Sequence, residues 1–307
     1  MARILLTGAT GFIGSQAARS LVEQGHEVHA LVRDGADIAR IADILPRIRI
    51  VPGSLTSLAD VRDRIIQLQP EICLHLAWYS VPGLYLVSTE NILHLQWTLE
   101  LLQITAEAGC LRFVGAGTCL EYDTSKGTLS ETGVLAPDTL YSVCKLATCS
   151  IARDFAEKRK MEFAWLRFFY QYGPFEHPKR VVPAVITSLL SGGRAAVSRG
   201  TQVRDFLHVA DVGSAVAAVA TSGIAGPVNI GSGIPVTVRE IVEITAELCG
   251  GPERVDYGAI PQRDGDPAYI VADNSRLRST GWEQRFDLRS GLRDSVEWWR
   301  NHSTMGR

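Results

Sequence analysis

A tyrosine and a lysine lie four residues apart in the stretch LYSVCK, at Tyr141 and Lys145. Residues at this spacing share one face of a helix, so the lysine ammonium group would lie near the tyrosine phenol. An unperturbed tyrosine has a pKa of about 10, too high for efficient proton transfer at neutral pH, and a nearby positive charge lowers that pKa. The pair therefore predicts a general acid and base.

A threonine hydroxyl is the next candidate, because Thr118 ends the segment GAGT at residues 115–118. This segment closes a predicted strand, and from the carboxyl end of that strand the hydroxyl could reach both Tyr141 and a substrate oxygen. A threonine alone at such a place is better explained by a helix cap or a strand-end hydrogen bond. Combined with Tyr141 and Lys145, it favours catalysis.

The chain opens with MARILLTGATGFIGS, in which a strand-like run leads through three glycines into a helix-like stretch. Gly8 would form the tight turn, Gly11 would let the backbone approach a pyrophosphate, and Gly14 would let helix and strand pack closely. Glycines also make ordinary turns, but this turn stands between a strand and a helix. We therefore expect it to bind a dinucleotide.

The end of the second predicted strand indicates which nicotinamide cofactor is bound. An acid there would bond the ribose 2′-OH, whereas this strand ends in Val32 and Arg33. A 2′-phosphate, with a charge of about −1.5 to −2, is attracted by a guanidinium and repelled by a carboxylate. NADP(H) is favoured, and NAD(H) is the alternative if Asp34 binds the ribose.

The elements that must position these residues alternate between strand and helix. Strands are expected at RILLTG, EVHALVR, RIRIVPG, EICLHLAW and LRFVGAG, with helices at Ser15–Gln24 and Thr89–Ala108 between them. This rhythm predicts an α/β fold with a Rossmann-type doubly wound parallel sheet, which binds ligands at the carboxyl ends of its strands.

The rhythm weakens beyond about Tyr172, which predicts a smaller C-terminal cap. We expect an NAD(P)-binding domain at residues 1–170 and a mainly substrate-binding cap at residues 171–307. Segments near 204–225 and 268–275 are expected to return to the first domain.

Composition excludes several classes of function. The formal net charge of −2 over 307 residues provides no electrostatic footprint for nucleic acid. The first apolar run, residues 4–6, is too short for a signal peptide or a membrane span. Six scattered cysteines show no spacing typical of a metal site or a disulfide framework. We expect a cytoplasmic protein with no metal and no nucleic-acid or membrane partner.

Taken together, these motifs resemble the extended short-chain dehydrogenase/reductase family, which comprises nucleotide-sugar epimerases, dehydratases and reductases. The matching segments are Thr7–Gly14, His75–Ala77, Thr118, Tyr141 with Lys145, Leu166–Phe169, Tyr172–Pro174, Arg204–Val209, Asp211 with Val212, Pro227–Gly231, Arg263–Asp266, Asp273–Leu277 and Gly281 with Trp282. Such an ordered series along nearly the whole chain is far more specific than any single motif.

The resemblance implies a role for each matching residue. Tyr141 would be the catalytic acid/base, Lys145 would orient the nicotinamide ribose and tune the tyrosine, and Thr118 would bond the reacting oxygen. The implied cofactor-binding residues are Gly8, Thr10, Gly11, Phe12, Ile13, Gly14, Arg33, Leu55, Leu76, Ala77, Tyr141 and Lys145. The substrate-binding candidates are Trp78, Glu121, Tyr170, Arg204 and Arg263, of which the two arginines would contact a diphosphate.

Departures from the family pattern indicate which reaction to expect. Dehydratases of the family place an Asp-Glu pair directly after the catalytic threonine, whereas this chain has Cys119 and Leu120. That disfavours a standard dehydratase, although Glu121 leaves a variant elimination open. The missing acid beside Arg33 favours a reductase, because a net reductase exchanges its cofactor and commonly uses NADPH.

We therefore predict NADPH-dependent reduction of a nucleotide-diphosphate keto-sugar of the 4-keto-6-deoxyhexose type. The alternatives are an epimerase with tightly held NAD, a variant dehydratase and, from another class, a non-catalytic NADP(H)-sensing or scaffold protein. A homodimer is also expected, because helices near 89–108 and 141–160 match those that family members pair into a four-helix interface. The stripe formed by Leu95, Leu99, Leu102 and Ala106 is equally compatible with internal core.

Overall fold

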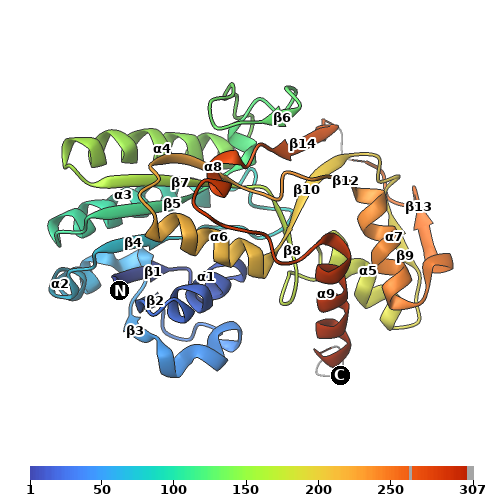
Figure 1. The fold of residues 1–307 in the computed structure, drawn as a ribbon, viewed down its shortest axis with the longest axis horizontal. Coiled ribbons are helices and arrows are strands. Elements are labelled where there is room, and N and C mark those ends of the chain that lie inside the picture. Colours follow the sequence, from blue (N-terminus) through green and yellow to red (C-terminus); the bar gives the residue numbers. More distant parts are fainter. Residues whose placement is uncertain (263–264, 303–307) are drawn as a thin grey trace.

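The computed structural model describes residues 1–262 and 265–302, and its larger part is built on one parallel sheet of seven strands. The strand order is β11-β7-β5-β4-β1-β2-β3 (Figure 1), and every neighbouring pair runs parallel. The strands are β1 (Arg3–Thr7), β2 (Glu27–Val32), β3 (Arg49–Pro52), β4 (Ile72–His75), β5 (Arg112–Thr118), β7 (Glu162–Phe168) and β11 (Gly226–Ile230). The predicted Rossmann-type sheet is confirmed.

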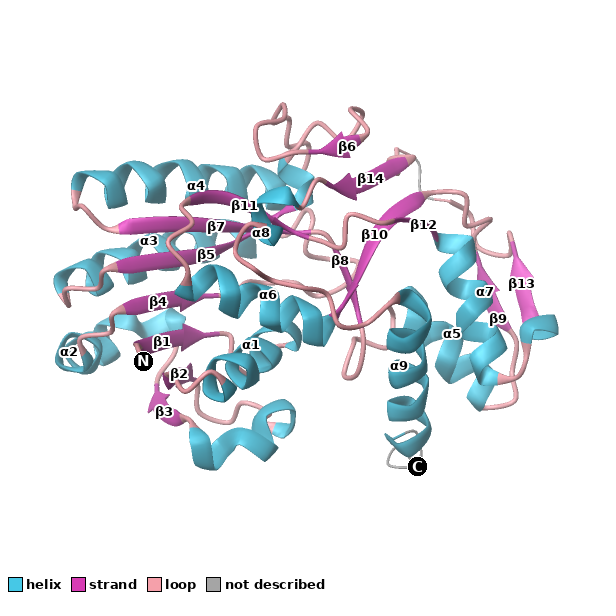
Figure 2. Ribbon diagram, viewed as in Figure 1, coloured by secondary structure: helices cyan, strands magenta, loops and turns pink. Residues whose placement is uncertain are grey.

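Helices cover both faces of this sheet (Figure 2), and each face has its own buried core. On one side lie α1 (Phe12–Glu23) and α6 (Val209–Thr221), which pack against each other. On the other side lie α2 (Leu58–Leu68), α3 (Glu90–Glu107) and α4 (Leu140–Lys158). Strands buried on both faces carry a continuous apolar run, as β1 does at residues 4–6 and β4 at residues 72–74.

The smaller part is a cap that lies beyond the carboxyl ends of the large sheet (Figure 1). Its main sheet has the order β12-β10-β14-β6, with β8 beside β10, and a separate pair joins β13 to β9. These strands are β6 (Thr128–Leu129), β8 (Tyr170–Tyr172), β9 (Ala195–Val197), β10 (Val203–His208), β12 (Pro235–Thr237), β13 (Val255–Tyr257) and β14 (Tyr269–Ala272). Helices α5 (Val181–Leu190), α7 (Val238–Cys249) and α9 (Leu288–His302) surround the third core.

The chain reaches the cap sheet first at β6, and after the longer passage from β8 to β10 it returns to the large sheet at slightly different places from those expected. The returning segment is α6 together with β11, whereas β10 belongs to the cap sheet. Within the second expected segment, β14 also joins the cap sheet, and only the short helix α8 (Ser275–Arg278) packs against β11. Hydrophobic patterns in short strands do not say which sheet they join, because the pairing partners are distant in sequence.

Short 3-10 helices link several of these elements. They are η1 (Ala39–Arg47), η2 (Leu55–Ser57), η3 (Cys119–Glu121) and η4 (Pro252–Arg254). Across residues 1–262 and 265–302, no helix is long and apolar enough to cross a membrane. The same residues contain no group of three His, Cys, Asp or Glu side chains that could hold a metal ion.

Candidate active site

The glycine turn between β1 and α1 has the geometry of a dinucleotide cradle. Gly8 has a φ of +79°, which favours glycine, and a Cβ at Gly14 would collide with the carbonyl oxygen of Gly8. Helix α1 begins after Gly11 with no side-chain cap, so no side chain of its own N-cap takes the first amide groups. Such amides suit a pyrophosphate, and these residues therefore fit a nicotinamide dinucleotide.

The end of β4 lies directly against this turn. A Cβ on Gly8 would be 2.8 Å from the backbone nitrogen of Ala77 and 3.0 Å from the carbonyl carbon of Leu76. Thr7 and His75 connect the same two strands, because the Thr7 hydroxyl lies 2.8 Å from Nδ1 of His75. Burial lowers the pKa of His75 to about 3, so this imidazole is a neutral structural link.

The remaining cofactor candidates surround the turn at different depths. Thr10, Phe12 and Ile13 are half-buried, as is Leu55 at the start of η2. Arg33 is exposed immediately after β2. Arg40 of η1 was not predicted, and it donates hydrogen bonds to the carbonyl oxygens of Thr10 (3.4 Å) and Phe175 (3.1 Å). Those carbonyl partners come from loops far from Arg40 in the sequence, so no local motif signals this contact.

The structure brings the three candidate catalytic residues together. Thr118 ends β5, while Tyr141 and Lys145 lie in the first two turns of α4. Helix α4 begins here because Thr139 and Ser142 form a reciprocal capping box. The Lys145 ammonium is buried, donates to the carbonyl oxygen of Ala116 at 2.7 Å, and lies 5.7 Å from the centre of the Tyr141 ring.

Burial dominates the proton affinities of this cluster. It raises the pKa of Tyr141 well above its usual value, and a hydrogen bond with Thr118 acts in the opposite direction. It lowers the pKa of Lys145 well below its usual value, while the charge of Glu121 favours the ammonium form. The expected lowering of the phenol pKa by Lys145 is not present in this arrangement.

Aromatic rings surround the lysine and the tyrosine. The ammonium nitrogen of Lys145 lies 3.7 Å from the centre of the Trp78 ring, a cation–π contact. The Trp78 indole is itself fixed by a 2.8 Å hydrogen bond to Asn91. Tyr85 packs edge-on against Tyr141, with ring centres 4.9 Å apart. Tyr85 and Asn91 were not predicted, because only their contacts with Tyr141 and Trp78 distinguish them.

The positions of the dehydratase acid pair carry no acid in this chain. Cys119 is buried, and burial raises the pKa of its thiol to about 12. Glu121 is fully buried and faces the protein interior, contrary to its assignment as a substrate contact. Its Oε1 accepts hydrogen bonds from the Thr118 backbone amide (2.8 Å) and Trp165 (2.9 Å), and its Oε2 accepts one from Arg167 (2.8 Å). The chain turns through η3, and this turn directs the carboxylate inward.

Two further substrate candidates meet where β8 lies beside β10. The guanidinium of Arg204 lies 5.3 Å from the Tyr170 ring centre. Arg204 is buried and pairs with Asp266 at 2.7 Å, so a diphosphate would have to compete with that carboxylate. Arg263 lies outside the described residues. A second cation, Arg180, lies 5.8 Å from the Tyr85 ring centre and was not predicted.

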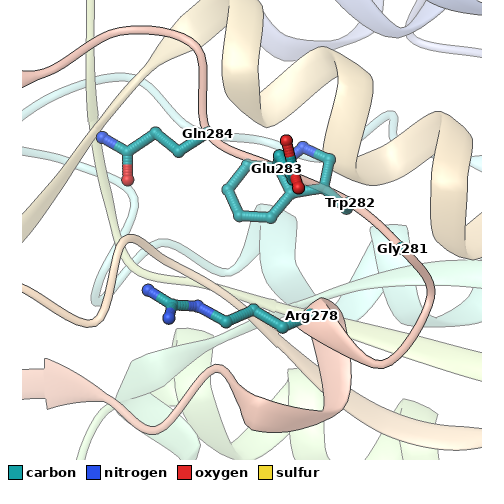
Figure 3. Close-up of a pocket in the computed structure, with 5 residues that line it drawn as sticks. All are labelled: Arg278, Gly281, Trp282, Glu283 and Gln284. Carbon is teal, nitrogen blue, oxygen red and sulfur yellow. The ribbon is translucent and has the colours of Figure 1, made fainter.

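A separate hollow of about 320 Å³ lies away from these residues, between α8 and the loop leading to α9 (Figure 3). It is lined by Arg278, Gly281, Trp282, Glu283 and Gln284. The Trp282 indole donates a 2.9 Å hydrogen bond to Ser214 of α6, which fixes this loop against the large domain. None of the candidate catalytic residues lines it, and we assign it no ligand.

Comparison with known proteins agrees with this geometry. Residues 4–231 match the NAD dependent epimerase/dehydratase family. The chain belongs to this family. It is 30% identical to a dTDP-glucose 4,6-dehydratase of Streptomyces griseus, over 97% of this chain and 94% of the relative. It is 27% identical to a UDP-glucose 4-epimerase of Neisseria meningitidis serogroup C, over 98% of both chains.

Solved structures extend the likeness to the whole fold. The UDP-glucose 4-epimerase of Thermotoga maritima, solved with UDP-glucose, has 25% identity and a TM-score of 0.86, covering 98% of this chain and 99% of its own. MoeE5, in complex with UDP-glucose and NAD, has 32% identity and a TM-score of 0.81 over the same shares. The chain is therefore an enzyme of the NAD-dependent nucleotide-sugar epimerase/dehydratase family.

Proposed function

We propose that this enzyme interconverts a hydroxyl and a carbonyl group on the sugar ring of a nucleotide diphosphate sugar by hydride transfer. The observation that carries the proposal is the cluster of Thr118, Tyr141 and Lys145 at the carboxyl end of β5. The cluster lies at the edge of the sheet where doubly wound folds bind their ligands. The glycine turn after β1 opens at the same edge.

Each side chain has one task in this reaction. The nicotinamide cofactor, when bound, accepts or supplies the hydride. Tyr141 takes the hydroxyl proton when the ring carbon is oxidised and returns it when the carbonyl is reduced. Thr118 donates a hydrogen bond to the same oxygen while negative charge develops there. Lys145 orients the nicotinamide ribose.

An epimerase reaction has the strongest support. It removes a hydride from one face of the ring carbon and returns it to the other, so it needs no acid to expel water. The dehydratase acid positions are Cys119 and Leu120, and Glu121 is bound to Trp165 and Arg167. Two relatives solved with UDP-glucose, one of them also with NAD, support a nucleotide diphosphate sugar as the substrate.

A reductase of a 4-keto-6-deoxyhexose nucleotide is the second candidate, and Arg33 favours it. β2 ends without the carboxylate that would bind an NAD ribose, and Arg33 follows it on the surface. A reductase would consume NADPH, whereas an epimerase leaves its cofactor unchanged overall.

Product analysis with defined cofactors distinguishes these reactions. The purified enzyme is incubated with UDP-glucose or dTDP-glucose and NAD⁺, or with a 4-keto-6-deoxyhexose nucleotide and NADPH, and products are identified by NMR. An isomeric sugar without net change in absorbance at 340 nm supports the epimerase. Stoichiometric loss of NADPH supports the reductase. Formation of a 4-keto-6-deoxy product from dTDP-glucose would contradict both proposals.

The cofactor preference has its own test in Arg33→Ala. If Arg33 binds the 2′-phosphate, the variant should lose about tenfold or more in NADPH affinity, since such charged hydrogen bonds contribute about 1.5–3 kcal/mol. Its affinity for NADH should not change. Calorimetric titration measures both, and an unaltered NADPH to NADH ratio would remove the argument for a reductase.

A further inference from the structure

A fully buried carboxylate lies directly behind the candidate catalytic threonine. Glu121 is 0% exposed, and its Oε1 accepts a 2.8 Å hydrogen bond from the backbone amide of Thr118. The Thr118 hydroxyl accepts in turn from the backbone amide of Leu120 at 3.3 Å. These two bonds form a capping box around η3, so the backbone and the side chain of Thr118 are both held.

The sheet is built to admit this carboxylate. Gly115 and Gly117 of β5 lie opposite Trp165 and Arg167 of β7 in the parallel register. A Cβ on Gly115 would collide with the Trp165 indole, and a Cβ on Gly117 would lie 2.6 Å from Oε1 of Glu121. The two glycines therefore provide the space in which the indole and the carboxylate meet. This packing explains why glycine stands at both positions of the GAGT segment.

Charge compensation comes from the neighbouring strand. Oε2 of Glu121 pairs with Nε of Arg167 at 2.8 Å, and the two side chains are 0% and 2% exposed. Arg167 also lies over the Tyr122 ring, with its guanidinium carbon 4.4 Å from the ring centre. Burying such a pair costs several kcal/mol of desolvation per ion, so a pair of apolar side chains would serve stability equally well. Stability alone does not explain its presence beside Thr118.

Helix α4 closes the network from the other side. Lys145 and Cys149, one turn apart on that helix, both feel the charge of Glu121. The charged and titratable groups around the carboxylate are Arg167 from β7, Cys119 and Tyr122 beside it in the chain, and Tyr141, Lys145 and Cys149 from α4. The carboxylate thus contacts the strand end that carries Thr118 and faces the helix that carries Tyr141.

We propose that Glu121 is a positioning residue, which fixes the backbone of Thr118 so that its hydroxyl meets Tyr141 and the reacting oxygen. Arg167 makes this possible by neutralising the carboxylate in the interior. The inference rests on the role proposed above for Thr118. It replaces a direct substrate contact by Glu121 with an indirect action through the threonine.

A double substitution separates positioning from stability. Glu121→Leu alone leaves Arg167 as an unpaired buried charge and should destabilise the fold. Glu121→Leu with Arg167→Met removes both charges and should restore most of the urea midpoint lost in the single variant. It cannot restore the hydrogen bond between the Thr118 backbone amide and the carboxylate. We expect kcat of the double variant to stay low, on the order of 10²-fold below the parent, with KM nearly unchanged. If kcat recovers together with stability, the pair is only structural and the proposal is wrong.

A readout without substrate tests the contact itself. In protein labelled with ¹⁵N-threonine, the Thr118 amide resonance is assigned by its loss in Thr118→Ser. Hydrogen bonding to a carboxylate should shift this proton downfield, and the double variant should move it upfield and speed its exchange with solvent. An unchanged resonance would overturn the proposal even if the enzyme turned over no nucleotide sugar. A changed resonance in an enzyme inactive on those sugars would instead count against the proposed function alone.

The same two strands offer a control ion pair, in which the arginine is buried and the glutamate is exposed. Arg112 and Glu162 are the first residues of β5 and β7, at the end of these strands opposite to Thr118. They form an ion pair at 2.6 Å. The variant Arg112→Met with Glu162→Leu should change stability without moving the Thr118 amide or lowering kcat per folded molecule. An equal effect of this control on the amide would mean that any disturbance of the two strands suffices, which would also overturn the proposal.

Discussion

Tyr141 is the residue on which the proposed chemistry depends most directly. Tyr141→Phe removes the phenolic hydroxyl and leaves the ring in its edge-on contact with Tyr85. The substitution should lower kcat on the order of 10²- to 10⁴-fold, because general acid/base catalysis contributes that much. Cofactor affinity, measured by fluorescence titration, should stay within a factor of about two. Tyr85→Phe is the control, since it keeps the ring packing and all of the proposed proton donors.

Glu176 provides a test of how burial changes the pKa of a single carboxyl group. It lies in the loop between β8 and α5, is 7% exposed, and its Oε2 has no hydrogen-bond partner among the described residues. Burial raises its pKa from 4.5 to about 8, and Arg180 only partly opposes this. At a pH between these two pKa values, the Glu176 carboxyl keeps its proton in the folded chain and has released it in the unfolded chain. The parent should therefore lose stability as pH rises through this window, relative to a variant without the carboxyl group.

Glu176→Gln removes that linkage. Its advantage over the parent in free energy of unfolding should be smallest near pH 5 and should grow by up to about 1.4 kcal/mol per pH unit towards pH 8. Urea denaturation at pH 5, 6.5 and 8 measures this difference. A constant difference across the three values would show that the Glu176 carboxyl titrates at its ordinary pKa.

At the scale of elements, sequence patterns predict those features whose residues lie close together in the chain. The glycine turn, the strand ending at Thr118 and the helical pairing of Tyr141 with Lys145 all depend on residues within one turn or one strand. The Glu121–Arg167 pair joins residues 46 positions apart, and its partners are adjacent only because β5 pairs with β7. Glu121 was for this reason assigned to the substrate, although the register of two strands directs it to Arg167. Arg40 was not predicted for the same reason, because its carbonyl partners lie on two loops distant in the sequence.

The pairing of β5 with β7 makes Gly117 sensitive to any side chain. A Cβ there would collide with the Trp165 indole as well as approach Glu121. Gly117→Ala should destabilise the protein by about 1–3 kcal/mol, as overpacking of a close-packed core does, and should lower kcat by displacing Thr118. Denaturant unfolding measures the first effect. Gly223→Ala, where a Cβ meets nothing within 4 Å, should change the free energy of unfolding by much less, and equal losses in both variants would contradict the packing argument.

For the whole molecule, the outer surfaces of α3 and α4 argue for a homodimer. Exposed apolar side chains gather on these two helices, with Ile92 44%, Leu93 39%, Val143 46% and Ile151 47% exposed. The two helices pack side by side, so a second copy related by a two-fold axis would bury both pairs in one four-helix interface. Leu95 and Leu99 of the predicted stripe are half-buried on α3, whereas Leu102 of the same stripe belongs to the core.

If the predicted dimer forms through this surface, charge placed on it should keep the chain monomeric. Val143→Asp with Ile151→Asp would bury two carboxylates per copy at the interface, which an association of this kind cannot accommodate without their neutralisation. Light scattering during size-exclusion chromatography should give twice the 33.5 kDa chain mass for the parent and the single mass for the variant. Leu111→Asp is the control, because Leu111 is 64% exposed, immediately precedes β5 and lies outside both helices. A parent that is monomeric at every concentration tested would instead assign these apolar side chains to ordinary solvent-facing surface.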